Sequence, residues 1–271
     1  MKTISDLLVH LETVAPLELA ESWDNVGLLV GDPSRQVQRV MTALTIVPTN
    51  VQEAIDGQAD LIVTHHPLPF HPLKKITVDS VPGKLMWRLM GAGVSIFSPH
   101  TAWDNAASGI NRQLAELLRL KDVEPLLPSK NPRLAACGLG TGRTGLLQGA
   151  TSLAEIATQL SAPLKATQIS LVGSPEKRVN KIGIVCGSGA SLLAAAHAAG
   201  CDAFLTGEAT FHQCLEAESY GMSMILLGHF ASEKFGLCHL NHLLQHHHPD
   251  IHFWSSSAES EPATPFTPSN L

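Results

Sequence analysis

Short apolar runs alternate with amphipathic stretches along most of the 271-residue chain. Val40–Val47 and Leu61–Thr64 are rich in β-branched and aliphatic residues, so each run predicts a buried strand. Asn50–Gly57, which lies between them, predicts a compact crossover helix. Because parallel strands need such crossovers and are buried on both faces, the pattern predicts an α/β fold with mixed, mostly parallel sheets.

The same alternation extends to both ends of the chain. Thr3 and Asp6 have the spacing of a helix N-cap and its N3 carboxylate, and Pro16 ends that helix. Ser152 and Glu155 form a capping-box pattern at the start of another helix. Further helices are predicted at Lys84–Met90, Ile110–Leu118 and Ala231–Leu244, and further strands at Val26–Val30, Val94–Phe97, Lys181–Cys186, Ala203–Thr206 and Met224–Leu227.

Proline positions divide the predicted elements into two lobes. Three prolines within Val123–Arg133 are incompatible with helix interiors and central strands, so this segment is the expected linker. The first lobe then covers residues 1–122 and the second covers residues 134–254. Ser255–Leu271 is rich in Ser, Pro and Thr, and we expect it to be disordered or loosely attached.

The two halves resemble each other in order and detail. Ala59–His71 aligns without gaps with Cys201–Gln213, and Gly93–Asp104 aligns in the same way with Met222–Glu233. One explanation is a duplication whose pseudo-twofold would bring polar residues of both halves to one interface. The alternative is that any two β-α-β units look alike at this level.

Composition excludes several functional classes. The formal net charge is −6 and the basic residues are scattered, which argues against a nucleic-acid partner. No apolar run of about 18 residues is present and the N-terminus lacks the pattern of a signal peptide, which argues against a membrane protein. Five cysteines without a C-x-x-C pair favour buried thiols in a reducing, cytoplasmic compartment: Cys137, Cys186, Cys201, Cys214 and Cys238.

Residue types that bind metal ions follow three of the predicted strands. The C-terminal ends of parallel strands meet at one edge of a sheet, where open α/β folds place their ligands. The i, i+4 spacing of His229 and Glu233, at the start of a predicted helix, also puts both of these side chains on one helix face. The residues are His65 with His66, His100 with Asp104, and His229 with Glu233.

Imidazole and carboxylate ligands without thiolate favour Zn, Mn, Fe, Ni or Co over a cysteine-rich structural zinc. A carboxylate such as Asp104 could bridge two divalent ions, as two-metal hydrolytic sites require. Such ions would lower the pKa of a bound water and polarise a carbonyl, amidine or phosphoryl group. His100 and Glu208 are then the candidate proton-transfer residues, if they are not ligands.

Three further features each leave two interpretations open. Trp23–Asn25 either places a carboxylate near the sheet edge or forms a turn with Trp23 in the core. Cys186–Gly189 could offer amides to an anion, but a tight structural turn is favoured because the dinucleotide and P-loop spacings are absent. His246–His248 resembles a metal cluster, but a solvated helix end is favoured.

Five motifs together resemble the GTP cyclohydrolase 1 type 2 homologue family, also called NIF-three-like. The resemblance spans roughly Ile4 to Trp254, and its H-H-P-L and G-H-x-x-x-E elements are the most specific. The motifs are WDNVGLLVG (Trp23–Gly31), DLIVTHHPLPF (Asp60–Phe70), HTAWDNA (His100–Ala106), DAFLTGE (Asp202–Glu208) and GHFASEKFG (Gly228–Gly236).

The resemblance implies two similar, intertwined α/β lobes, a dinuclear metal site between them and a toroidal hexamer. It places the metal ligands on His65, His66, Asp104, His229 and Glu233. This sequence departs from the family at Thr45, where an aspartate is usual, so any contact made by that aspartate is in doubt.

Two functions remain as hypotheses. The first is a metal-dependent hydrolase of a small-molecule substrate, a nucleotide or related heterocycle, of which opening of the GTP imidazole ring is the concrete version. The second is a non-enzymatic protein for metal binding, metal delivery or partner interaction.

Overall fold

The computed structural model describes residues 2–263, which form two compact α/β units. The first unit comprises the described residues up to Gly109 together with Gly236–Glu259. The second comprises Ile110–Phe235 and the described residues from Ser260. Because the chain leaves the first unit and later returns to it, the predicted intertwined α/β lobes are confirmed. Among the described helices, none has the length and apolarity needed to cross a membrane.

The first unit is built on a five-stranded sheet with the order β1-β4-β3-β2-β13. Neighbouring strands run parallel except for β1, which pairs with β4 in the antiparallel sense. Its elements are α1 (Ile4–Val14), η1 (Leu17–Leu19), β1 (Gly27–Val30), β2 (Arg39–Ala43), α2 (Pro48–Asp56), β3 (Leu61–Thr64), α3 (Val81–Gly91), β4 (Ser95–Ser98), α4 (His100–Asn105), the C-terminal part of α10 (His229–His247) and β13 (His252–Ser255).

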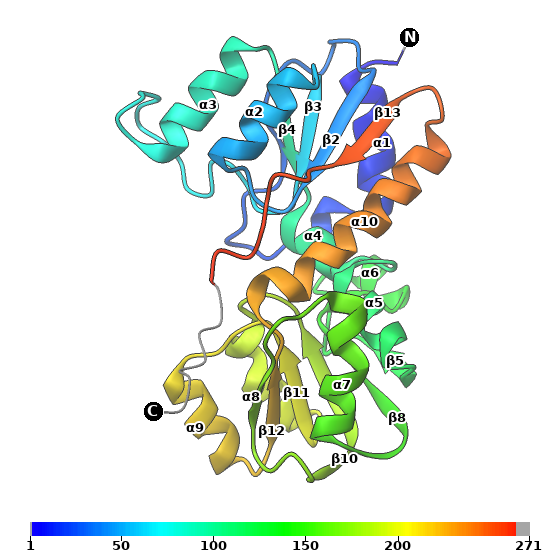
Figure 1. Cartoon of the computed structure of the whole chain (residues 1–271). Coiled ribbons are helices and arrows are strands. Elements are labelled where there is room, and N and C mark those ends of the chain that lie inside the picture. The colour runs from blue at the N-terminus through cyan, green and yellow to red at the C-terminus, as the bar shows by residue number, and fades with distance from the viewer. Residues whose placement is uncertain (1, 264–271) are drawn as a thin grey trace, which may run out of the picture. The chain divides into compact units, whose positions relative to one another are not determined.

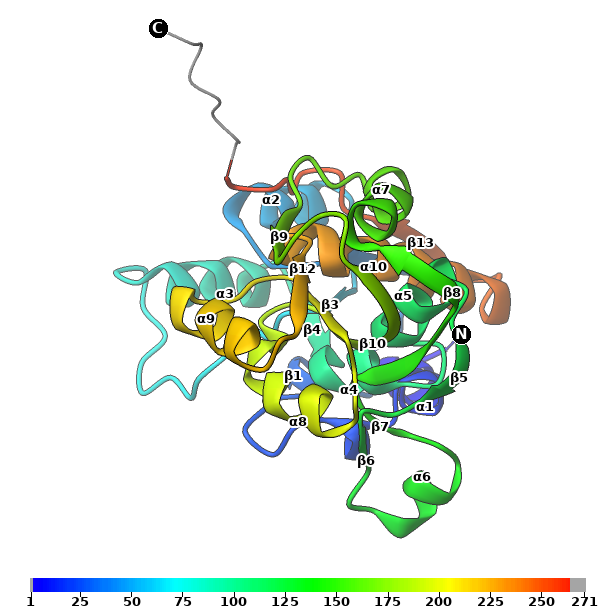
Figure 2. The ribbon, with the colours of Figure 1, turned by 90° about the horizontal axis from the view of Figure 1, so that it is seen from below.

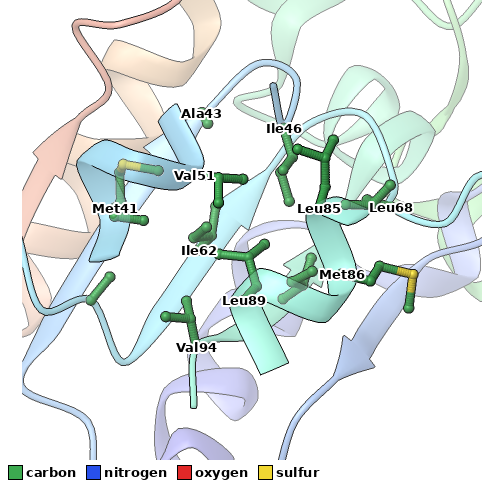
Figure 3. Packing of buried hydrophobic residues seen from close by; sticks show 13 residues of the cluster. Met41, Ala43, Ile46, Val51, Ile62, Leu68, Leu85, Met86, Leu89 and Val94 are labelled. Carbon is green, nitrogen blue, oxygen red and sulfur yellow. The ribbon is translucent and has the colours of Figure 1, made fainter. Parts of the chain in front are cut away.

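Helices cover both faces of this sheet (Figure 1). Alternate residues of β2, β3 and β4, among them Met41 and Ile62, pack against α2 and α3 in one apolar cluster (Figure 3). On the opposite face, the Asn241 side chain of α10 donates a hydrogen bond to Thr42 Oγ1 at 3.2 Å. Two-sided burial explains why these strands are apolar runs and not alternating ones.

The second unit contains a six-stranded sheet with the order β5-β8-β10-β11-β12-β9. The central strands β10, β11 and β12 are parallel, whereas the pairings of β5, β8 and β9 are antiparallel. The elements are α5 (Ile110–Leu117), β5 (Lys121–Glu124), β6 (Leu127–Pro128), α6 (Pro132–Ala136), β7 (Gly140–Thr141), β8 (Arg143–Ser152), α7 (Leu153–Leu164), β9 (Ser170–Val172), β10 (Arg178–Val185), η2 (Gly189–Leu192), α8 (Leu193–Ala198), β11 (Ala203–Thr206), α9 (Phe211–Ser219), β12 (Ser223–Leu226) and the first turns of α10.

The second sheet is also covered on both faces. Helices α8 and α9 lie on one side of β10–β12, where Leu193 and Ala217 pack against Phe204 and Met224, and α5 and α7 lie on the other side (Figure 2). The two parallel cores, β2-β3-β4 and β10-β11-β12, therefore have the same strand order and helical crossovers.

The internal similarity extends to individual hydrogen bonds. Asp60 and Asp202, which are paired by the sequence alignment, each accept hydrogen bonds from two consecutive amides of the neighbouring strand segment. These amides belong to Gln38 and Arg39 in the first unit and to Asn180 and Lys181 in the second. The second alignment differs from the strand pairing by one residue. Leu61 pairs with Ser95, whereas the equivalent Ala203 pairs with Ser223, which lies one position before the residue aligned with Ser95.

Two features differ from the expected boundaries. The segment expected as a linker, Val123–Arg133, lies within the second unit, where β5 pairs with β8 and Pro132 starts α6. Residues 255–259 of the expected loose tail are tied to the first unit, because Ser255 pairs with Thr42 and Glu53 accepts a hydrogen bond from Ser256 Oγ. Residues 264–271 of that predicted tail lie outside the described part of the chain.

Candidate metal centre

Three histidines converge at the carboxyl edge of the first sheet. His65 and His66 directly follow β3, and His100 begins α4 just after β4. One ring nitrogen of each of these residues lies within 4.8 Å of the others, and His65 is fully buried. Asp104, one turn along α4 from His100, brings its Oδ1 to 3.5 Å from His65 Nε2. The first unit therefore gathers four of the predicted site residues.

His100 is oriented by a buried carboxylate. Asp24 Oδ1 accepts a hydrogen bond from His100 Nδ1 at 2.7 Å, and Asp24 also accepts bonds from the amide and hydroxyl of Thr101. Burial opposes ionisation of Asp24, but these bonds outweigh it and hold its pKa below the usual value. His100 has a φ of 32°, a left-handed conformation that costs a non-glycine residue about 1–2 kcal/mol. The Asp24 bond leaves His100 Nε2 as the atom available for proton transfer or coordination.

Thr45 contacts His66 directly. Its Oγ1 lies 2.6 Å from His66 Nδ1, so a ring donating from Nδ1 would present Nε2 as a ligand. Thr45 stands where the resembled family usually has an aspartate, and its hydroxyl is able to orient this imidazole.

Two aromatic side chains lie beside His100. The Trp23 and Phe70 rings are 6.1 Å apart between centroids, and their centroids lie 6.1 and 6.0 Å from that of His100. Trp23 is 61% exposed, so the interpretation that placed it in the core is wrong. The Asn25 side chain donates to Pro69 O at 2.7 Å and ties the two aromatic segments together.

The second unit contributes a separate set of polar residues at the start of α10. His229 Nε2 lies 3.1 Å from Glu233 Oε2, and its Nδ1 lies 3.0 Å from Glu208 Oε1. Glu208, which follows β11, also accepts a hydrogen bond from Ser188 Oγ. The hydrogen bond to Glu233 and both negative charges raise the pKa of His229 to about 9, against the opposing effect of burial. Hydrogen bonds from Ser188 and His229 lower the pKa of Glu208.

The glycine turn after β10 makes room for this set. Gly187 has a φ of 58°, and a Cβ at this position would lie 2.1 Å from Glu233 Oε1. Its amide donates to Ser232 Oγ at 3.0 Å. The turn therefore has the structural role that was favoured. Because glycine has no side chain, it leaves the space that the Glu233 carboxylate occupies.

A cavity of about 390 Å³ opens beside Glu208 and His229 within the second unit. Lys165, Gln168 and Glu261 contribute to its polar lining. The second unit thus offers space for a small molecule next to its ligand-type residues.

Both sets of side chains suit a borderline divalent ion. With metal–ligand bonds of about 2.0–2.2 Å, two ligands of one tetrahedral ion lie roughly 3.4 Å apart. The His65–Asp104 distance of 3.5 Å and the His229–Glu233 distance of 3.1 Å fall near that value. Imidazole and carboxylate donors, which divalent transition metals bind, occur in both units, and the choice among Zn, Mn, Fe, Ni and Co stays a prediction.

A family profile described as Duf34/NIF3 (NGG1p interacting factor 3) matches residues 2–262. The chain belongs to the Duf34/NIF3 family. This confirms the resemblance inferred from the five sequence motifs.

Relatives of this Duf34/NIF3 chain cover nearly its whole length. A GTP cyclohydrolase 1 type 2 homolog of Streptomyces coelicolor is 32% identical over 97% of this chain and 94% of its own. The GTP cyclohydrolase 1 type 2 of Helicobacter pylori is 31% identical over 86% of this chain and 88% of its own. The crystal structure of a Bacillus cereus protein related to NIF3 superposes with a TM-score of 0.88, at 21% identity, over 98% of this chain and 99% of that one. The last comparison supports the fold.

The run His246–His248, for which a solvated helix end was favoured, differs from that expectation at one residue. His246 and His247 are exposed, as expected for a solvated helix end, but His248 is only 8% exposed. His248 Nε2 lies 2.9 Å from His10 Nδ1 of α1, and Lys2 Nζ lies 3.0 Å from His248 Nδ1. Burial lowers the pKa of both His10 and His248. His248 therefore helps to attach α1 to the end of α10.

Proposed function

We propose that this Duf34/NIF3 chain is a metal-dependent hydrolase that acts on a nucleotide or related heterocycle. The observation that carries the proposal is the convergence of His65, His66 and His100, one nitrogen each within 4.8 Å, beside Asp104. Two divalent ions would be held jointly by residues from both units, namely His65, His66, Asp104, His229 and Glu233. The name of the Helicobacter pylori relative, GTP cyclohydrolase 1 type 2, supports the same class of reaction.

Bound divalent ions would supply Lewis acidity toward water and toward a carbonyl, amidine or phosphoryl oxygen. His100 is the proposed proton-transfer residue, because the bond from its Nδ1 to Asp24 fixes its tautomer and leaves Nε2 as the nitrogen that can take up a proton. Glu208 is the second proposed proton-transfer residue, in the unit that carries His229.

The exposed aromatic pair supports a planar substrate. Stacking of a base on an aromatic side chain contributes about 1–3 kcal/mol and tolerates different bases. Trp23 and Phe70 offer such a surface close to His100. A cytoplasmic location and the toroidal hexamer implied by the family resemblance stay part of the proposal.

The experiment starts from protein purified without an affinity tag and loaded with Zn, Mn, Fe, Ni or Co in turn. Turnover of GTP, other nucleotides and cyclic amides is then compared between wild type, His66→Ala and Glu233→Ala. His212→Ala, which removes an exposed histidine from α9, is the matched control. We expect loss of turnover in the two ligand variants alone. Tight metal binding without turnover on any substrate would favour a role in metal binding or delivery.

A double-mutant cycle tests whether both units serve one centre. Residues that share a bound ion show strongly non-additive losses of affinity, whereas independent sites give additive losses. We expect the His66→Ala, Glu233→Ala double variant to lose little more affinity than the worse single variant. Additive losses would contradict the shared centre.

A further inference from the structure

The segment that follows β13 runs along the loop between β2 and α2. Glu53 of α2 accepts hydrogen bonds from the Ser256 hydroxyl and from the amides of Ser257 and Ala258, at 2.6, 3.1 and 3.3 Å. Thr49 Oγ1 donates to Ala258 O at 2.8 Å. These contacts attach residues 256–258, which we call the strap, to α2.

The strap is followed by Glu259, whose carboxylate accepts hydrogen bonds from backbone amides. Glu259 accepts hydrogen bonds from the Leu44 amide, at 2.9 and 3.0 Å to its two oxygens, and from the Thr45 amide at 3.1 Å. Charge-assisted bonds from two consecutive amides are stronger than neutral ones, and they fix the orientation of the peptide plane between the two residues.

The same two residues contact His66 from their other side. Leu44 O accepts a hydrogen bond from the His66 amide at 2.8 Å, and Thr45 Oγ1 lies 2.6 Å from His66 Nδ1. Both the backbone and the ring of His66 therefore depend on the position of the peptide that Glu259 holds. The chain from carboxylate to imidazole contains one intervening residue, Thr45.

We propose that Glu259 is a positioning residue for His66 and acts through Thr45, and that the strap holds Glu259 in place. The proposal rests on the proposed function in that His66 serves as a metal ligand. Groups that orient metal ligands typically contribute 10–100-fold in metal affinity. Residues 256–259 would then help to orient a ligand of the metal centre.

The test compares Glu259→Ala and the nearly isosteric Glu259→Gln with Glu218→Gln, which changes an exposed carboxylate on α9. Metal affinity is measured by competition with a chelator, in the full chain. We expect Glu259→Ala to bind metal about 10-fold more weakly, Glu259→Gln to recover part of the loss, and the control to match wild type.

A readout in metal-free protein separates this proposal from the proposed function. The His66 Nδ1–H resonance, assigned by comparison with His66→Gln, should shift or broaden in Glu259→Ala and in Thr45→Val. The double variant should shift or broaden the resonance little more than either single variant, because both substitutions interrupt the same hydrogen-bonded path from Glu259 to His66. A wild type that binds no metal would contradict the proposed function while this resonance still tests the positioning. An unchanged resonance together with wild-type metal affinity in Glu259→Ala would overturn the role of Glu259.

Discussion

Replacing Gly187 by alanine tests the placement of Glu233 most directly. The added Cβ would lie 2.1 Å from Glu233 Oε1 and 3.4 Å from His229 Nε2. Because Cβ atoms do not approach other heavy atoms closer than 3.0 Å, the carboxylate must retreat by about 1 Å. The Glu233–His229 contact at 3.1 Å would be lost or reoriented.

Two separable effects follow from this substitution. The positive φ of 58° costs alanine about 1–2 kcal/mol of stability, whatever surrounds it. Displacement of a metal ligand by about 1 Å should lower metal affinity 10- to 100-fold, by analogy with the loss of ligand-orienting contacts. Gly200→Ala is the matched control, since its φ is 71° and its Cβ would meet nothing within 4 Å.

Thermal unfolding and calorimetric metal titration of both variants provide the assay. Both variants should lose a similar amount of stability, and Gly187→Ala alone should lose metal affinity. In metal-free protein, the pKa of His229 should fall from about 9 toward its ordinary value of 6.5, because the Glu233 hydrogen bond is the largest cause of its rise. Gly187→Ala with wild-type metal affinity and an unchanged His229 titration would refute the assignment of Glu233.

Three further predictions concern the first unit. Asp24→Asn should reduce kcat at least about 10-fold with a smaller effect on metal affinity, because it weakens the orientation of the proton-transfer histidine; equal losses in both quantities would contradict this. Trp23→Ala should raise KM for a heterocyclic substrate about 10-fold without changing metal content, and an unchanged KM would exclude stacking. Burial lowers the pKa of His10 and His248, so the unfolded state binds more protons below about pH 6.5 and stability should fall on acidification. In His10→Gln the loss of melting temperature between pH 7 and pH 5 should be smaller than in wild type, and an identical loss would contradict the assignment.

Local patterns predicted the elements best where burial is complete. The strands Leu61–Thr64 and Ala203–Thr206 have the predicted bounds, because every residue in them is buried and an aspartate precedes each of them. The predicted strand Val40–Val47 ends earlier, at Ala43, because Pro48 begins α2 and the intervening residues form the loop to it. Apolar character alone does not separate a strand end from a buried loop.

Contacts between residues distant in sequence could not be predicted in the same way. His100 and Asp24 are 76 residues apart, and Thr45 and Glu259 are 214 apart, so no periodicity links either pair. The low hydrophobicity of the C-terminal segment predicted that it has little to bury. It did not reveal that hydrogen bonds to Glu53 attach the segment instead.

The repeated scaffold explains how one fold can carry two chemically different sets of side chains. Asp60 and Asp202 make equivalent bonds to backbone amides, and the hydroxyls of Thr64 and Thr206 both donate to a carbonyl just beyond the neighbouring strand. Two positions after these threonines the halves differ, with His66 in one and Glu208 in the other, and the side chains of these two residues contact Thr45 and Ser188. The strands before them keep the same parallel pairing in both sheets, although the side chains at these strand ends differ in charge and basicity. In the proposed function, an imidazole-rich set from the first unit and a carboxylate-rich set from the second would both take part, an asymmetry that suits a reaction in which one set orients the attacking group and the other accepts a proton.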